Sequence, residues 1–185
     1  GSDNGYFMGE HTYWDKRIAY EPSMRIPLIM RFPGMIKPGK QVEQLCLNID
    51  IAPTILNLAG VEIPEYMQGK SLLPLLENNG QAQWRSSFLF EYYVDDAYPY
   101  AGPDLLAVRT DSFKLVDAFL DKDIDELYNL TLDPGEMKNL ISDPEYKNVE
   151  VRLRRELERL KEQYGYNPDR DWWLRKTIEG SPALK

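Results

Sequence analysis

The sequence predicts an α/β region followed by a small antiparallel sheet covered by one helix, and three observations carry this prediction. A nearly continuous apolar run at residues 26–32 is typical of a strand buried on both faces. From residue 86 the chain is rich in aromatic and β-branched segments, which favour antiparallel strands. A long helical pattern then closes this part. We therefore divide the chain into the last part of an α/β domain over 1–83, a sheet-and-helix subdomain (α+β) over 84–164 and an irregular tail over 165–185.

The first part also contains two predicted helices and one short extended piece. Asp50 is suited to precede a helix that has Pro53 in its first turn and ends at Gly60. A helical turn follows at 72–77, and 42–47 reads as extended. These elements supply too few strands to flank a doubly buried strand. We therefore expect residues 1–80 to complete a sheet that begins in sequence preceding this chain.

For the second part, the sequence predicts a meander of strands and one amphipathic helix. Strands are expected at 88–94 and 126–130, with a hairpin at 105–119 turning at Thr110-Asp111-Ser112. A helix is expected over 144–164, because apolar side chains recur there at intervals of three and four residues. The stripe consists of Val149, Leu153, Leu157, Leu160 and Tyr164.

Composition restricts the possible functions. The 185 residues are 43% hydrophobic and 28% charged, as in globular proteins. No apolar run approaches the roughly 20 residues of a membrane span. The net charge of −8 argues against a nucleic-acid partner. The single Cys46 excludes an internal disulfide framework, and its leucine neighbours favour a buried structural thiol.

The opening segment collects the candidate functional side chains. Asp3 and Asn4 offer hard oxygen ligands that suit Ca²⁺, with Mg²⁺ as a possibility. His11 follows, and Lys16 and Arg17 could bind an anion beside the metal. A metal next to cationic groups can stabilise charge on a transferring sulfuryl or phosphoryl group. Taken alone, Asp-Asn-Gly is also a common turn signal, so these residues leave both interpretations open.

An ordered series of short motifs resembles the second half of the type I sulfatases, members of the alkaline-phosphatase superfamily. The resemblance runs from residue 1 to about residue 163. It implies that the first unit is the C-terminal part of a sulfatase-type α/β sandwich. The motifs are Ser2-Asp3-Asn4-Gly5, Gly9-Glu10-His11, Trp14-Asp15-Lys16, Tyr20-Glu21, Arg25-Ile26-Pro27-Leu28, Asp50-Ile51-Ala52-Pro53-Thr54, Gln68-Gly69, Glu126-Leu127-Tyr128-Asn129-Leu130 and Asp133-Pro134-Gly135-Glu136.

The resemblance also implies roles for individual residues. Asp3 and Asn4 match two ligands of the active-site calcium. Lys16 matches the lysine that contacts the sulfate oxygens, and His11 matches a histidine found near the substrate in many members. Glu21 and Arg25 are expected to be structural, and Asp50 to be a helix cap instead of a metal ligand.

The chain departs from the sulfatase pattern at the nucleophile. Sulfatases use a formylglycine made within a Cys/Ser-x-Pro/Ala-x-Arg motif, and no such motif occurs here. Formylglycine and the remaining calcium ligands are therefore expected in an N-terminal half of the same enzyme, and this chain alone is expected to be inactive. The substrate would be a sulfated small molecule or carbohydrate, with the loop from Asp95 to Gly102 as a candidate sugar contact. A phosphonate or phosphodiester hydrolase of the same superfamily and a non-catalytic module that binds sulfated sugars are the alternatives.

Overall fold

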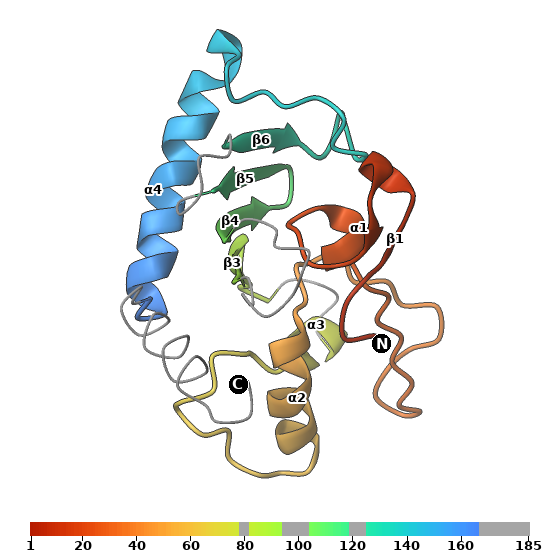
Figure 1. The fold of residues 1–185 in the computed structure, drawn as a ribbon. Coiled ribbons are helices and arrows are strands. Elements are labelled where there is room, and N and C mark those ends of the chain that lie inside the picture. Colours follow the sequence, from red (N-terminus) through yellow and green to blue (C-terminus); the bar gives the residue numbers. More distant parts are fainter. Residues whose placement is uncertain (78–81, 94–103, 119–124, 167–185) are drawn as a thin grey trace, which may run out of the picture.

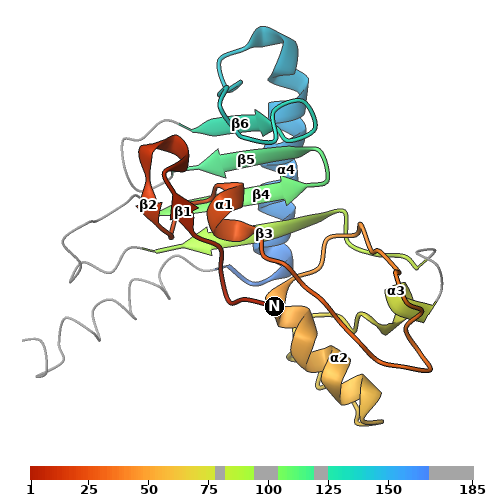
Figure 2. The ribbon, with the colours of Figure 1, turned by 90° about the vertical axis from the view of Figure 1, so that its right-hand side faces the viewer.

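A four-stranded antiparallel sheet lies between a long helix and the N-terminal segment (Figure 1). The computed structural model describes residues 1–77, 82–93, 104–118 and 125–166. Figure 2 shows the sheet face-on, with helix α4 behind it and the first elements of the chain in front of it. Both faces of this sheet are therefore covered, one by each end of the described chain.

The sheet is a meander in the order β3-β4-β5-β6, which confirms the predicted strands and hairpin. The hairpin turn is closed by the Thr110 hydroxyl, which accepts from the Phe113 N–H and donates to the Phe113 carbonyl, both at 3.0 Å. Each strand pairs with the next along the chain, so every ladder forms between segments that are close in sequence. The strands are β3 Ser87–Tyr92, β4 Leu105–Thr110, β5 Phe113–Asp117 and β6 Glu126–Asn129.

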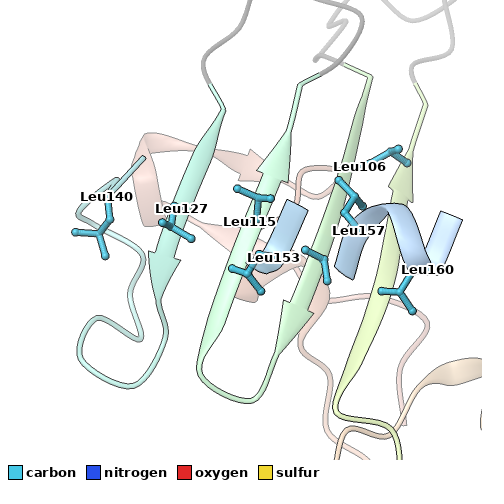
Figure 3. Close-up of a cluster of buried hydrophobic side chains, with 8 residues drawn as sticks. Leu106, Leu115, Leu127, Leu140, Leu153, Leu157 and Leu160 are labelled. Carbon is cyan, nitrogen blue, oxygen red and sulfur yellow. The ribbon is translucent and has the colours of Figure 1, made fainter. Parts of the chain in front are cut away.

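The predicted C-terminal helix is confirmed as a 3-10 turn, η3 Pro144–Tyr146, followed by α4 Lys147–Gln163. Leu153, Leu157 and Leu160 on its apolar stripe are each only 1% exposed. They pack against alternate residues of the sheet, as Figure 3 shows. This cluster is the main core, and its sheet side consists of Leu106, Val108, Leu115, Leu127 and, beyond β6, Leu140.

The polar face of α4 carries ion pairs. Glu150 accepts from Lys147 at 2.6 Å and from Arg154 at 2.9 Å, and these two hydrogen bonds lower the pKa of its carboxyl. Lys147 is 66% exposed and Arg154 37% exposed, whereas the Glu150 side chain is only 7% exposed. Solvent reaches the basic partners and screens these pairs, so each contributes less to the free energy of folding than a fully buried pair would.

The opposite face of the sheet is covered by short elements from the start of the chain. A two-stranded ribbon, β1 Phe7–Met8 with β2 Trp14–Asp15, encloses the 3-10 turn η1 Glu10–Thr12. It leads to α1 Glu21–Met24. Ala19 is buried against Leu105, Ala107 and Val116 of the sheet. The N-terminal segment is therefore held on the sheet and does not pack as a separate unit.

A third group of buried leucines lies away from the sheet, where α2 and α3 meet. The 3-10 turn η2 Asn48–Asp50 runs into α2 Ile51–Leu58, and Gly60 ends this helix at a φ of +68°, as predicted. The predicted helical turn is α3 Leu73–Glu77. Cys46 is partly buried against α3, and this burial raises the pKa of its thiol, which agrees with a structural role.

The predicted strand at 26–32 is wrong, because this segment pairs in a sheet with no residue that the structure describes. The piece predicted as extended at 42–47 forms neither a helix nor a sheet strand. Ile29 is 86% exposed and Phe32 46% exposed, so this apolar run is not buried on two faces. An apolar run fixes no strand by itself, because a strand also needs a neighbour that accepts and donates its backbone hydrogen bonds.

Four predictions concern residues outside those described. They are the tail from residue 167 onward, the end of the first strand at 94, the end of the second hairpin strand at 119 and the loop from Asp95 to Gly102. The domain boundaries remain predictions. No helix in the described ranges combines the length and the apolar character needed to cross a bilayer.

Candidate active site

The structure brings two of the predicted site residues, Asn4 and Lys16, into direct contact. The Lys16 Nζ donates to the Asn4 Oδ1 at 3.3 Å, although twelve residues separate them in the sequence. The Asn4 Nδ2 donates to the Gly5 carbonyl at 2.5 Å, which orients the amide. An amide oxygen has two lone pairs, so Asn4 can accept from Lys16 and still offer an oxygen to a cation.

Asp3 lies beside this pair as an exposed carboxylate. Hydrogen bonds from the backbone N–H groups of Asp3 and Asn4 are the main reason why the pKa of its carboxyl is lowered. It is therefore an anion at neutral pH. The Asn48 Nδ2 donates to the Asp3 backbone carbonyl at 2.6 Å, which ties this segment to η2. The two hard oxygen donors are thus adjacent in sequence and are fixed by a residue 45 positions away.

Gly5 is required at its position by a close approach of two backbones. A Cβ atom there would lie 2.0 Å from the Pro22 carbonyl oxygen, so no larger residue fits without displacing α1. The Gly5 N–H donates to the Ser23 carbonyl at 2.8 Å. The glycine of the Asp-Asn-Gly motif therefore allows the backbone segment that carries the oxygen donors to pack closely against α1.

Lys16 projects from a tight turn with an uncommon backbone conformation. Its neighbours Asp15 and Arg17 have φ values of +90° and +118°, and their side chains pair with each other at 2.9 Å. The Arg17 N–H donates to the Ser23 Oγ at 3.0 Å. Non-glycine residues at such φ values cost about 1–3 kcal/mol each and persist only where surrounding contacts enforce them.

His11 packs on the ring of Tyr20. The two rings stack at a centroid distance of 4.3 Å and an angle of 25°. The Tyr20 hydroxyl donates to Glu126 at 3.1 Å and lies 3.4 Å from the Tyr128 hydroxyl. Burial, the largest of several influences, raises the pKa of Tyr20 to about 12, so this hydroxyl remains a proton donor at neutral pH. Strand β6 therefore sets the place of Tyr20, and through it that of His11.

A fully buried lysine anchors the segment between Lys16 and α1 to the sheet. The Lys114 Nζ on β5 contacts the Ala19 carbonyl at 2.8 Å, Glu21 at 2.9 Å and Glu136 at 2.5 Å. Glu136 also accepts from the Glu21 N–H at 2.7 Å, and Glu21 pairs with Arg109 at 3.2 Å. Burial raises the pKa of Glu21, but the charges of Lys114 and Arg109 outweigh this effect and lower it overall. Glu21 is thus structural, as predicted.

A second buried anchor surrounds Asp50, which is fully buried. Asp50 precedes α2 as predicted, but its carboxylate makes no capping bond to that helix. It accepts instead from Arg85 through both oxygens, at 2.5 and 2.6 Å, and from the Leu47 and Lys70 N–H groups at 2.8 Å. Next to it, a Cβ at Gly69 would meet the Ile49 carbonyl oxygen at 1.9 Å. The segments that carry the Asp50 and Gln68-Gly69 motifs therefore pack together, next to Asn48 in η2.

The donor set at residues 3 and 4 fits part of a calcium site. One carboxylate and one amide oxygen are hard ligands, but Ca²⁺ takes six to eight oxygens. Within the described ranges, no group of three or more His, Cys, Asp or Glu side chains could hold a metal ion. Asp3 and Asn4 can thus serve as ligands only together with further donors.

Comparison with known proteins identifies the family. A family model described as N-sulphoglucosamine sulphohydrolase, C-terminal, matches residues 9–163. The chain belongs to this sulfatase family. The match covers the N-terminal segment after Met8, the sheet and α4, so it includes both buried anchors as well as His11 and Lys16.

Individual sulfatases support the same conclusion. An N-acetylglucosamine-6-O-sulfatase of Bacteroides thetaiotaomicron is 42% identical over 173 residues, covering 91% of this chain and 30% of the relative. A solved structure in complex with its substrate D-glucosamine-2-N,6-O-disulfate has a TM-score of 0.85 at 40% identity, covering 90% of this chain and 34% of that one. A phosphonate monoester hydrolase of Agrobacterium radiobacter has a TM-score of 0.74 at 30% identity, covering 88% and 34%. This sulfatase chain spans about a third of the length of these relatives.

The side chains that support the predicted site could not be identified from the sequence alone. Lys114 is weakly marked as unusual, because it is a lysine within a strand that is otherwise mostly apolar. Glu136 is marked only by the Asp133-Pro134-Gly135-Glu136 motif, and no sequence pattern marks Ser23 or Asn48. Their partners are distant in sequence: Lys114 bonds to Ala19 across 95 residues and Asn48 to Asp3 across 45. Such pairings become visible only in the folded chain.

Proposed function

We propose that this chain is part of a sulfatase that hydrolyses sulfate esters of amino sugars, in which preceding sequence supplies the nucleophile and the remaining metal ligands. The hydrogen bond between Lys16 and Asn4 carries this proposal, since it sets a cation beside a hard oxygen donor. The family match and the relatives' threefold greater length support it.

Asp3 and Asn4 would hold a calcium ion together with ligands from the preceding sequence. Between them, an anionic carboxylate and a neutral amide oxygen offset only one of the metal's two positive charges. Calcium bound there would polarise a sulfate oxygen and offset negative charge on the sulfuryl group. The chain's own contribution is to hold the two oxygens at a fixed place, through Asn48 on one side and α1 on the other.

Lys16 is proposed to bind the sulfate oxygens next to the metal. Its ammonium group is exposed, and its distance of 3.3 Å from Asn4 keeps it within reach of an anion held by the metal. There it would stabilise charge that grows on the leaving oxygen. Arg17 adds positive charge to the same turn while it pairs with Asp15. His11 is proposed as a further substrate contact, oriented by its stacking on Tyr20.

The amino-sugar substrate is proposed from the relatives. The N-acetylglucosamine-6-O-sulfatase of Bacteroides thetaiotaomicron covers nine tenths of this chain. A human N-acetylglucosamine-6-sulfatase is 35% identical over 175 residues. The solved structure with the highest TM-score among those given above holds a glucosamine disulfate. A 6-O-sulfated glucosamine is therefore the first substrate to test.

The test compares variants of the intact enzyme that contains this chain. Sulfate release from N-acetylglucosamine 6-sulfate is measured in calcium and after chelation. Asp3→Ala and Lys16→Ala are expected to abolish turnover, whereas Lys37→Ala, an exposed lysine elsewhere, should retain it. Normal activity in Asp3→Ala would show that the metal-ligand assignment is wrong.

A phosphonate monoester hydrolase is the second candidate, because two solved members of that class match this fold at 30% identity. A paired assay with an aryl phosphonate monoester and the sulfated sugar separates the two activities. Faster cleavage of the phosphonate would favour this second candidate. Sugar binding that survives chelation without any turnover would instead indicate a non-catalytic module.

A further inference from the structure

We infer that Ser23 is a positioning residue which holds Lys16 at the correct place relative to the metal ligands. This inference rests on the proposed function. Ser23 lies in α1, is only 6% exposed, and has no direct contact with Lys16, Asp3 or Asn4 among the hydrogen bonds of the described residues. Its effect on the reaction would therefore act entirely through the backbone.

Ser23 contacts both segments that carry the candidate site. Its backbone carbonyl accepts from the Gly5 N–H at 2.8 Å, next to Asn4. Its side-chain hydroxyl oxygen accepts from the Arg17 N–H at 3.0 Å, next to Lys16. One residue thus fixes the distance between the segment with the oxygen donors and the turn with the lysine.

The turn around Lys16 needs such a restraint because its backbone is strained. Asp15 and Arg17 flank the lysine at φ values of +90° and +118°. L-residues leave such conformations when they are free to do so. The hydrogen bond from the Arg17 N–H to Ser23 is a restraint on this strained peptide from another element. Without it, the turn can relax and carry Lys16 away from Asn4.

The rest of α1 makes Ser23 a rigid support. Two residues before it, Glu21 contacts the buried Lys114 at 2.9 Å and pairs with Arg109 at 3.2 Å. The Glu21 N–H is held by the buried carboxylate of Glu136 at 2.7 Å. These contacts connect α1 to β4, β5 and the loop after β6. Ser23 therefore connects the candidate site to an element whose position is fixed relative to the sheet.

The experiment uses Ser23→Ala and Ser23→Cys in the intact enzyme, with Ser71→Ala as the matched control. The Ser71 hydroxyl oxygen also accepts from a backbone N–H, that of Leu73 at 3.3 Å, but lies away from the site. Both Ser23 variants are expected to lower kcat by about 10- to 100-fold, with a smaller change in KM, because misplacement of a charge-stabilising group mainly affects the transition state. The calcium concentration for half-maximal activity should stay unchanged, and so should kcat in Ser71→Ala.

Two results would overturn the inference. The first is a kcat near the wild-type value in either Ser23 variant; Ser23→Cys keeps the side-chain volume and decides the case if the alanine variant fails to fold. The second is a loss of kcat that matches the fraction of unfolded protein in thermal melts, which would indicate a purely structural role. Lys16→Ala serves as the reference. If Lys16→Ala is fully active, the proposed function itself fails, whereas an inactive Lys16→Ala beside an active Ser23→Ala refutes only the positioning role.

Discussion

The buried Lys114 offers the sharpest test of how the N-terminal segment is held on the sheet. Its ammonium group is completely buried and has three oxygen partners, from Ala19, Glu21 and Glu136. Replacement by methionine keeps a long apolar side chain but removes the charge. Glu136, whose side chain is also fully buried, then has no cation beside it, and Glu21 retains only Arg109.

The expected cost of Lys114→Met follows from the carboxylate that is left behind. Removal of one partner from a buried ion pair costs about 3–5 kcal/mol, because the remaining charge is buried without compensation. The buried Ala19 carbonyl also loses its Lys114 donor, which adds about 1–3 kcal/mol. We therefore expect a fall of at least about 3 kcal/mol in the free energy of unfolding. The double variant Lys114→Met with Glu136→Gln should recover part of this loss, since no buried charge remains at Glu136.

The pH dependence of the loss provides a second readout. Burial is the largest influence on Glu136 and raises the pKa of its carboxyl, while Lys114 opposes this effect. Without Lys114 the pKa of Glu136 must rise further. A carboxyl with a raised pKa in the folded state destabilises that state once the pH exceeds the unfolded value, near 4.5. The deficit of Lys114→Met should therefore grow as the pH rises from 4.5 and level off above the folded pKa.

Equilibrium urea unfolding at several pH values measures both quantities. Lys147→Met is the matched control, because Lys147 also pairs with a glutamate, at 2.6 Å, but is 66% exposed. Exposed pairs contribute about 0–1 kcal/mol, so this control should unfold almost like the wild type. If Lys114→Met lost no more than Lys147→Met, the argument that the buried charges anchor the N-terminal segment would be refuted.

Three further predictions test the core, a close backbone contact and an acid-sensitive pair. Leu157→Ala should lower the free energy of unfolding by about 2–5 kcal/mol in urea titrations, since this leucine is 1% exposed in the main core. Gly69→Ala should lower the melting temperature markedly, because its Cβ would lie 1.9 Å from the Ile49 carbonyl oxygen, whereas Gly135→Ala meets only ordinary contacts and should not. Hydrogen bonds from two basic partners lower the pKa of Glu150, so its stabilising effect is present above about pH 4.5 and is lost as the pH falls below the folded pKa. The stability difference between wild type and Glu150→Gln should accordingly shrink in acid unfolding curves.

The sequence predicted the sheet and the long helix because their signals are local. The four strands are consecutive and joined in sequence order, and the stripe of α4 has a helical period that does not depend on other segments. The apolar run at 26–32 led to a wrong strand prediction because its packing depends on segments that are distant in sequence. Met30 alone in this run packs against the cluster around α3, while Ile29 is 86% exposed. An apolar run indicates that a segment prefers to be buried, but it does not indicate which other segment buries it.

The candidate site was predictable as a set of residue types and not as a geometry. Hard oxygens at Asp3 and Asn4 and a cation at Lys16 can be read directly from the sequence. The contact between Lys16 and Asn4 depends on a strained turn that no local propensity favours. Arg17 remains a predicted substrate contact, and the pairing of its guanidinium with Asp15 is seen only in the fold.

The distribution of backbone strain connects the site with its support. Five non-glycine residues in the described ranges have positive φ values: His11, Thr12, Asp15, Arg17 and Glu136. The first four lie in the segment that carries the candidate catalytic side chains. The fifth, Glu136, is the buried partner of Lys114, which holds that segment on the sheet. Strained conformations persist only where other contacts enforce them. The contacts of Lys114 with Ala19, Glu21 and Glu136 hold the chain next to this strained segment on the sheet. Under the proposed function, these buried charges would help to keep Lys16 beside Asn4.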